Sequence, residues 1–259
     1  MDNLGISINP GNMSLIPEYA ECGIQYVEIS LPGKGIDELR TFAGNAFGLT
    51  VRSGMTLWSV HLPFGTRLDI SSLEEEKRLG VLDELYRSID LAGELDAKVL
   101  VVHGSAEPNE ESSRPARMEA CMKSLQALQA HAGSMRIAVE NLPRTCIGRV
   151  SWEMALLKEC CGGVCFDVNH LLMEDHAAFL DAVAKDVITT HLSDYDGVDE
   201  RHWLCGMGIV PWKMVVSRLK SAGYQGPFLF ELGLDQNGRP YPPRDVVSAW
   251  QSVIGDGSV

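Results

Sequence analysis

The chain has 259 residues, of which 22 are Lys or Arg and 35 are Asp or Glu, so its formal net charge at pH 7 is −13. This acidic balance argues against DNA, RNA or another polyanion as the main partner, unless the basic residues gather on one face. Hydrophobic residues make up 45% and charged residues 22% of the chain, as in ordinary globular proteins. The length suits one large α/β domain or two small ones.

Three features of the sequence bear on its compartment. No apolar run approaches the roughly 18 residues that a membrane span requires, and the start, MDNLGISINP, lacks the basic and apolar regions of a secretory signal. Seven cysteines without framework spacing fit reduced thiols. The segment CCGGVC (160–165) has no CxxC pair, so we interpret its thiols as structural and not as zinc ligands. We expect a cytoplasmic protein without a membrane anchor.

In chain order, short segments rich in β-branched residues alternate with segments of helical periodicity. The predicted strands are 4–8, 26–30, 58–62, 98–103, 136–140, 163–168, 187–192 and 227–232. The predicted helices are 72–95, 115–132, 151–160, 177–185, 211–222 and 243–254. In the clearest helix the apolar residues that recur three or four apart are Leu79, Leu82, Leu85, Ile89 and Ala92. Eight strand–helix units without a linker predict a single (β/α)8 TIM-barrel domain over 1–259, in preference to a doubly wound open sheet.

Polar residues end most of these strands, at the face of a barrel where catalytic groups lie. In GGVCFDVNHLL (162–172), for example, a buried apolar run is followed at once by Asp167, Asn169 and His170. The residues at the ends of strands three to eight are His61, His103, Glu140, Asp167, His191 and Glu231, and Glu28 holds the equivalent place on strand two. Because side chains alternate between the two faces of a strand, small or medium residues two positions earlier predict that these polar groups point into the barrel.

Several carboxylates and imidazoles gathered at one mouth are costly without a bound cation, because like charges repel one another where they are poorly solvated. A lone histidine or glutamate at a strand end is more often structural, so the prediction depends on the positions taken together. We expect Glu140, Asp167, His191 and Glu231 to bind one divalent ion. Their mostly oxygen ligands favour manganese, magnesium or cobalt, and zinc or iron is compatible as well.

Seven segments follow one another in a characteristic order: HLPF (61–64), VVHGS (101–105), AVENLP (138–143), FDVNH (166–170), HLSD (191–194), GMGIVPW (206–212) and FLFEL (228–232). As an ordered set they resemble the xylose-isomerase-like TIM-barrel superfamily, and within it the sugar phosphate isomerase/epimerase branch. This branch is related to apurinic/apyrimidinic endonuclease family 2. The resemblance implies that Glu140, Asp167, His191 and Glu231 are metal ligands, and that Glu140 and Glu231 also move the substrate proton. It further implies substrate contacts from His61, His103, His170, Arg201 and His202.

The function so implied is a divalent-metal-dependent isomerase or epimerase that acts on a small sugar, sugar phosphate or polyol-derived ketone. Loss of a proton beside a carbonyl gives an enediolate, whose charge a divalent ion spreads. One carboxylate removes the proton and a second returns one, to another carbon or to the opposite face. No nucleotide cofactor is expected, because GMG (206–208) lacks the strand–turn–helix context of a dinucleotide site. This segment is interpreted as a loop turn or, alternatively, as a phosphate site made of backbone amides.

Two other functions stay open. By resemblance, a three-zinc endonuclease would use His61, His103, Glu140, Asp167, His170, His191, His202 and Glu231, with Glu200 in place of an aspartate. Against it, the basic residues of the loops are scattered: Lys34, Arg67, Arg144, Arg149 and Arg239. Loops six and seven carry acidic residues expected to repel phosphates: Glu174, Asp175, Asp194, Asp196, Asp199 and Glu200. A metal-dependent dehydratase of a cyclic polyol would use the same ion. The sequence leaves the oligomeric state open, a homo-oligomer included.

Overall fold

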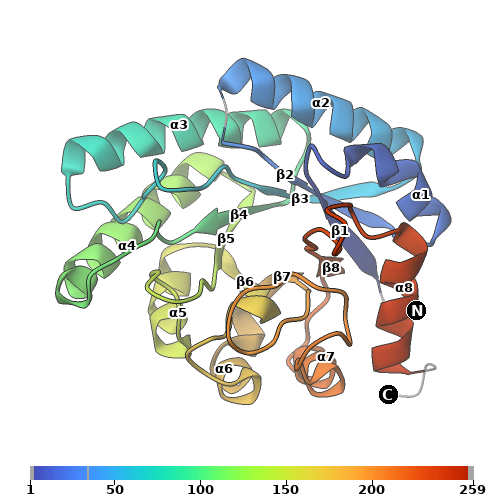
Figure 1. Cartoon of the computed structure of the whole chain (residues 1–259). Helices are drawn as coiled ribbons and strands as arrows, with labels where there is room; N and C mark the ends of the chain where they lie inside the picture. Colours follow the sequence, from blue (N-terminus) through green and yellow to red (C-terminus); the bar gives the residue numbers. More distant parts are fainter. Residues whose placement is uncertain (1–2, 34, 256–259) are drawn as a thin grey trace.

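Eight parallel strands lie at the centre, surrounded by eight α-helices, in the computed structural model, which describes residues 3–33 and 35–255 (Figure 1). The strands are β1 (Leu4–Ile8), β2 (Tyr26–Ser30), β3 (Thr56–His61), β4 (Val99–His103), β5 (Arg136–Glu140), β6 (Gly163–Asp167), β7 (Val187–His191) and β8 (Phe228–Phe230). The helices are α1 (Ile16–Glu21), α2 (Ile36–Arg52), α3 (Glu75–Glu94), α4 (Arg114–Ala132), α5 (Ser151–Leu157), α6 (His176–Val183), α7 (Trp212–Ser221) and α8 (Pro243–Ile254). The fold is the predicted (β/α)8 barrel.

The strands follow one another around the barrel in chain order, and β8 pairs in parallel with β1. The remaining seam, between β7 and β8, is closed by backbone bonds just beyond the end of β7. The Leu192 amide donates to the Leu229 carbonyl (2.8 Å), and the Glu231 amide donates to the Leu192 carbonyl (3.2 Å). These two bonds bring the end of β8, and with it Glu231, beside the end of β7.

The two sides of the strands pack into separate cores, as the alternation of side chains predicts. The residues Val60, Val102, Val139, Phe166 and Leu192 belong to the large core between strands and helices. The residues Val99, Val101, Ala138 and Cys165 form a second, small cluster, with Trp58 and Ile188 packed against it. This small cluster fills the inside of the barrel, beneath the polar residues that end the strands.

The helical layer differs from the prediction in two places. Helices α1 and α2 precede the first helix that the periodicity identifies, and α1 is only six residues long. Helix α3 begins at Glu75, and Leu79 in its second turn is 49% exposed. Leu79, the first of the apolar residues in the helical pattern, therefore lies off the buried face; Val81 and Leu82 are buried in this turn.

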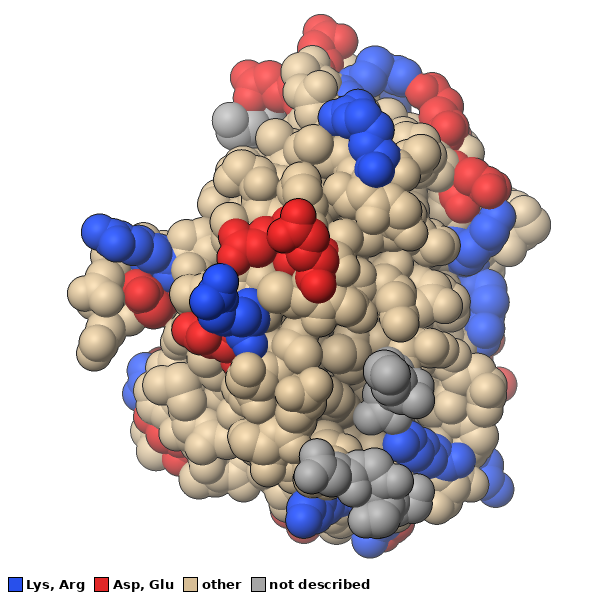
Figure 2. Space-filling model, turned by 90° about the vertical axis from the view of Figure 1, so that its right-hand side faces the viewer, with Lys and Arg blue, Asp and Glu red and all other residues tan. Residues whose placement is uncertain are grey.

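All seven cysteines are free thiols. None of the helices among the described residues is both long enough and apolar enough to cross a bilayer. On the face that carries the chain ends, Figure 2 shows the described Lys and Arg side chains in small groups interspersed with acidic ones. That face therefore offers no continuous basic surface within the described part of the chain.

Candidate active site

The polar residues predicted at the strand ends lie together at the carboxyl end of the barrel. His61, His103, Glu140, Asp167 and His191 are the last residues of β3 to β7, and Glu231 directly follows β8. The side chain of Asn141 fixes the ends of two neighbouring strands to each other. Its amide nitrogen donates to the Asp167 carbonyl (2.9 Å), and its oxygen accepts from the Asp167 backbone N–H (2.8 Å).

Glu140, Asp167, His191 and Glu231 form a compact group, which we call the inner site. One ligand atom from each lies within 4.8 Å of the others. The distances from His191 Nδ1 are 3.0 Å to Glu140 Oε1, 3.3 Å to Glu231 Oε2 and 3.9 Å to Asp167 Oδ2. Glu140, Asp167 and His191 are at most 1% exposed, whereas the Glu231 side chain is 22% exposed. The structure thus gathers the four predicted ligands, and Glu231 is the one open to solvent.

The donor set of the inner site fits a divalent cation. Asp167 Oδ1 accepts a hydrogen bond from the Asn169 amide (2.6 Å), but its buried Oδ2 has no hydrogen-bond partner among the described residues. Burial raises the pKa of Asp167 to about 6, because the charged carboxylate is poorly solvated there. An unpartnered buried carboxylate oxygen beside two further carboxylates and an imidazole is an arrangement that a bound cation would stabilise.

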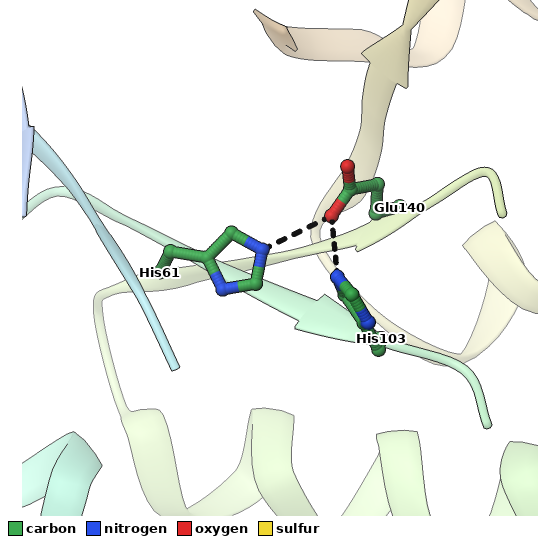
Figure 3. A group of neighbouring side chains, drawn as sticks. All are labelled: His61, His103 and Glu140. Carbon is green, nitrogen blue, oxygen red and sulfur yellow. Dashed lines mark hydrogen bonds and ion pairs between the residues drawn. The ribbon is translucent and has the colours of Figure 1, made fainter. Parts of the chain in front are cut away.

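Glu140 also joins the inner site to two further histidines. Its Oε2 lies 3.1 Å from the Nε2 atoms of both His61 and His103, which reach it from β3 and β4 (Figure 3). His61 Nδ1 lies 2.8 Å from the Leu62 carbonyl, so the proton on Nδ1 donates there and Nε2 faces the site. Burial acts to raise the pKa of Glu140, but His191 and His103 outweigh it and hold this pKa well below the usual range.

A third group of side chains lies nearer the surface. Glu200 Oε2 is 3.7 Å from His170 Nε2 and 3.9 Å from His202 Nε2. His170 Nδ1 faces the Asn141 carbonyl at 2.9 Å, which turns its Nε2 towards Glu200. Burial acts to lower the pKa of His202, but Glu200, Glu231 and Asp167 together outweigh it and the pKa rises to about 9. The additional zinc ligands proposed by resemblance therefore lie in two groups. His61 and His103 lie around Glu140, and His170 and His202 lie around Glu200.

The side chain of Arg201, for which a substrate contact is predicted, contacts residues of its own loop. Its Nε donates to Asp196 Oδ2 (2.8 Å), and its guanidinium carbon lies 6.0 Å from the centre of the Trp203 ring. Its backbone N–H donates to Asn169 Oδ1 (3.1 Å). The guanidinium thus orders the loop that carries Glu200 and His202.

Glu28 is a residue whose role the sequence does not reveal. Its fully buried carboxylate accepts hydrogen bonds from Ser7 Oγ (3.1 Å) and Ser59 Oγ (2.7 Å). Its Oε1 lies 3.0 Å from His191 Nε2, an ionic contact without good hydrogen-bond geometry. A carboxylate behind a metal-binding histidine orients the ring and favours the tautomer with its proton on Nε2, which would leave Nδ1 to bind an ion in the inner site. The only signal in the sequence is the place of Glu28 on β2.

Three acidic residues expected to face the mouth are structural instead. Asp194 is fully buried and accepts from the amides of Tyr195, Gly206 and Val210 and from Trp212 Nε1, at 2.7 to 3.1 Å. Glu174 accepts from the amide and hydroxyl of Ser151, and Asp175 caps the start of α6. These carboxylates satisfy N–H groups of the protein; burial removes Asp194 from the surface, whereas Asp175 stays exposed.

The GMG segment (206–208) is a packed turn. A Cβ atom on Gly208 would lie 2.0 Å from the Tyr195 carbonyl oxygen, so only glycine fits there. The Gly206, Met207 and Ile209 amides donate to Asp194 Oδ2, the Leu204 carbonyl and the Tyr195 carbonyl, respectively. The interpretation as a loop turn therefore agrees with the structure.

Cys165, on β6 beneath Asp167, has its sulfur within the same 4.8 Å grouping as ligand atoms of Glu140 and His191. Burial raises the pKa of this thiol well above its ordinary value, which keeps it protonated and a poor ligand.

A (β/α)8 barrel whose strand ends collect carboxylates and imidazoles is the architecture of metal-binding TIM-barrel proteins. The sequence model of the xylose isomerase-like TIM barrel family matches residues 16–250, and the chain belongs to this family. A curated relative, the uncharacterised protein MJ1311 of Methanocaldococcus jannaschii, is 26% identical over 185 residues. The match covers 66% of this chain and 63% of the length of that relative, so the chain spans less than two thirds of the relative.

Solved structures share the fold across the chain. A D-tagatose 3-epimerase-like protein is 21% identical with a TM-score of 0.76, and the match covers 98% of both chains. The 3-keto-D-glucoside 4-epimerase YcjR of E. coli is 17% identical with a TM-score of 0.74, over 98% of this chain and 99% of the other. D-Psicose 3-epimerase of Clostridium cellulolyticum H10 is 15% identical with a TM-score of 0.77, over 98% and 99%.

Proposed function

We propose that this protein is a divalent-metal-dependent isomerase or epimerase of a small carbohydrate. The observation that carries the proposal is the inner site, in which three carboxylates converge on one imidazole and Asp167 Oδ2 is buried without a hydrogen-bond partner among the described residues. The epimerase names of structures with the same fold support a carbohydrate substrate. Manganese, magnesium or cobalt suits the oxygen-rich donor set best, and zinc or iron is compatible.

The ion would be held by Glu140, Asp167, His191 and Glu231, and it would supply a positive charge that stabilises an enediolate next to the carboxylates. Glu140 and Glu231 come from β5 and β8, on opposite sides of β6 and β7, and so can approach a substrate from two sides. In one direction of the reaction Glu140 removes the proton beside the carbonyl and Glu231 returns one; the roles exchange in the reverse direction.

Other residues hold these two glutamates and the substrate. His61 and His103 contact the second oxygen of Glu140, which restricts its rotation. His170 and His202 lie around Glu200, where their ring nitrogens can bind substrate hydroxyl groups. Burial of Glu140, Asp167 and His191 keeps water away from one side of the site, which strengthens electrostatic contacts there.

Solvent deuterium exchange tests this function. Metal-loaded protein is incubated in D₂O with a panel of aldoses, ketoses and their phosphates, and products are identified by NMR. We expect deuterium at the carbon beside the carbonyl of at least one sugar, together with an isomer or epimer. A product that has lost water would show a dehydratase instead. Absence of both exchange and product across the panel would contradict the proposal.

A zinc-dependent phosphodiesterase acting on abasic DNA is the second candidate. It is favoured by the groups around Glu140 and Glu200, which complete the ligand set of the endonuclease relatives with Glu200 in place of an aspartate. Arg144 and Arg149 are paired with acidic side chains, and Lys34 lies outside the described residues. Cleavage of an abasic duplex that zinc restores and a chelator abolishes would establish this function in place of the first.

A further inference from the structure

A small pocket lies at the mouth of the barrel, next to the histidines of the site. Its volume is about 240 Å³, and its lining includes His103, His170 and Glu200 as well as Phe64 and Arg144. This volume is below the roughly 300–1,000 Å³ of pockets that hold drug-sized ligands. The pocket thus suits a small molecule that reaches the site from the side of the loops after β3, β4 and β5.

Arg144 is the one Lys or Arg that lines this pocket among the described residues, and three carboxylates already bind it. Its Nη1 lies 3.2 Å from Glu107 Oε1 and 2.5 Å from Glu200 Oε1, and its Nη2 donates to Asp199 Oδ1. We call these four residues the arginine–carboxylate cluster. It joins the loops after β4, β5 and β7, and its carboxylates outnumber its cation.

This cluster is a poor site for a phosphate or carboxylate group. Anion sites in proteins present unpaired Arg or Lys side chains or free backbone amides to the ligand. Here the guanidinium is shared among carboxylates, and the Gly206, Met207 and Ile209 amides of the loop after β7 are used within that loop. A phosphate on the substrate would meet the carboxylates of Glu107 and Glu200 in the pocket lining, and Arg144, whose charge three carboxylates share, offers it little compensation.

The rest of the pocket fits an uncharged ligand. The Phe64 ring is 46% exposed and stacks on His103, with ring centres 4.2 Å apart and planes at 27°. Leu142 and Pro143 add further apolar surface to the lining. Apolar faces of this kind pack against the C–H groups of a sugar, while the nearby imidazoles can hydrogen-bond its hydroxyl groups.

We infer that the substrate is an uncharged sugar without phosphate or carboxylate, and that the arginine–carboxylate cluster excludes the charged forms. The inference rests on the proposed function, since it names the class of sugar that the same site accepts. Arg144 acts here as a specificity-determining residue that holds three carboxylates at the mouth, and not as an anion-binding residue.

Matched pairs of free ketohexoses and their 6-phosphates test the inference, with both kcat/KM and calorimetric binding measured on metal-loaded protein. We expect the free sugar to be preferred by at least about 100-fold in the pair that reacts. An equal or greater kcat/KM for the phosphate would overturn the inference while leaving the isomerase function intact. If no sugar of either kind reacts, the proposed function fails. In that case tighter binding of the phosphates would also refute the charge argument, whereas tighter binding of the free sugars would support the charge argument.

A double variant, Glu107→Gln with Asp199→Asn, addresses the mechanism of exclusion. It frees Arg144 from two carboxylates, so the preference for the free sugar should fall by about tenfold or more. The matched control is Glu111→Gln, because the Glu111–Arg149 ion pair joins the same two loops, after β4 and β5, but neither residue lines the pocket. We expect no change of preference in this control. An unchanged preference in the double variant would show that the cluster does not select the substrate.

Discussion

The inner site and the arginine–carboxylate cluster are built from similar residue types but in opposite surroundings. In the inner site all residues but Glu231 are buried, and one carboxylate oxygen has no hydrogen-bond partner among the described residues. In the cluster each carboxylate shares a guanidinium, and the Arg144 side chain is 40% exposed. Exposed ion pairs contribute about 0–1 kcal/mol to stability, whereas unpaired buried charges are strongly unfavourable. The comparison indicates that the cluster is stable by itself, while the inner site is arranged for a ligand.

The largest effect that would test this contrast is expected for Asp167→Asn. Loss of the negative charge should weaken manganese binding by more than about 100-fold. This is a larger loss of affinity than is usual for residues that hold a metal ligand without binding the metal themselves. Without metal, the variant should be more stable by about 1–3 kcal/mol, because it removes a buried charge on an oxygen that accepts no hydrogen bond from the described residues. Calorimetric titration with manganese and urea unfolding in chelator measure the two effects. Unchanged affinity together with lower stability would show that Asp167 is only structural.

The second effect concerns Glu231, the exposed member of the inner site. Glu231→Gln should lower turnover by about 10²–10⁴-fold, because an amide cannot accept the substrate proton. The assay needs excess metal, since the substitution also removes a ligand charge. Thermal unfolding of the metal-free protein serves as the control and should change little, because the side chain is partly exposed. Full turnover in this variant would remove Glu231 from the proton-transfer pair.

A smaller effect is expected behind the inner site. Glu28→Gln should weaken metal binding by about 10–100-fold, because the carboxylate no longer favours the tautomer of His191 that leaves Nδ1 free. ¹⁵N NMR of the His191 ring reports the tautomer directly. Ser7→Ala is the matched control: it removes one hydrogen bond to Glu28 but leaves the charge. An unchanged tautomer in Glu28→Gln would assign Glu28 a packing role alone.

The smallest effect is expected at the surface, in the loop after β7. Hydrogen bonds from the Asp199 and Val198 amides, and then from Arg201, lower the pKa of Asp196 from 3.8 to about 2. The pKa of Asp196 is lower in the folded than in the unfolded state. The stability that these hydrogen bonds give the loop is therefore fully present above about pH 4 and is lost as the pH falls through about 2. The Val198 and Asp199 amide shifts should titrate with that midpoint and become insensitive in Asp196→Asn. A midpoint near the unfolded value would show that these bonds are not formed.

The sequence predicts the strands to within two residues, because β-branched runs and turn residues bound each of them. It also predicts which side chains share the mouth, since period-two alternation and parallel strands determine this. It does not reveal α2, whose glycines at positions 44 and 48 weaken the helical pattern. The contact between Glu28 and His191 depends on the curvature of the barrel, which brings β2 opposite β7. No local pattern encodes that distance.

The contacts of loop residues are not predicted by the sequence, for a different reason. Asp194 and Asp199 are the same residue type in one loop, yet the first is buried among N–H groups and the second pairs with Arg144. Arg144 itself has a backbone φ of 50°, a left-handed conformation that sequence periodicity does not predict for an arginine. The partners of these side chains are set by the packing of three loops, so only the folded structure distinguishes them.

The most direct measurement of the central claim is the number of metal ions per chain, determined by elemental mass spectrometry after purification without chelator and after dialysis against manganese, cobalt or zinc. We expect one tightly bound divalent ion in the wild-type protein and none in Asp167→Asn. Three zinc ions per chain, or an ion retained equally by Asp167→Asn, would contradict the assignment of the inner site as the metal centre of a sugar isomerase or epimerase.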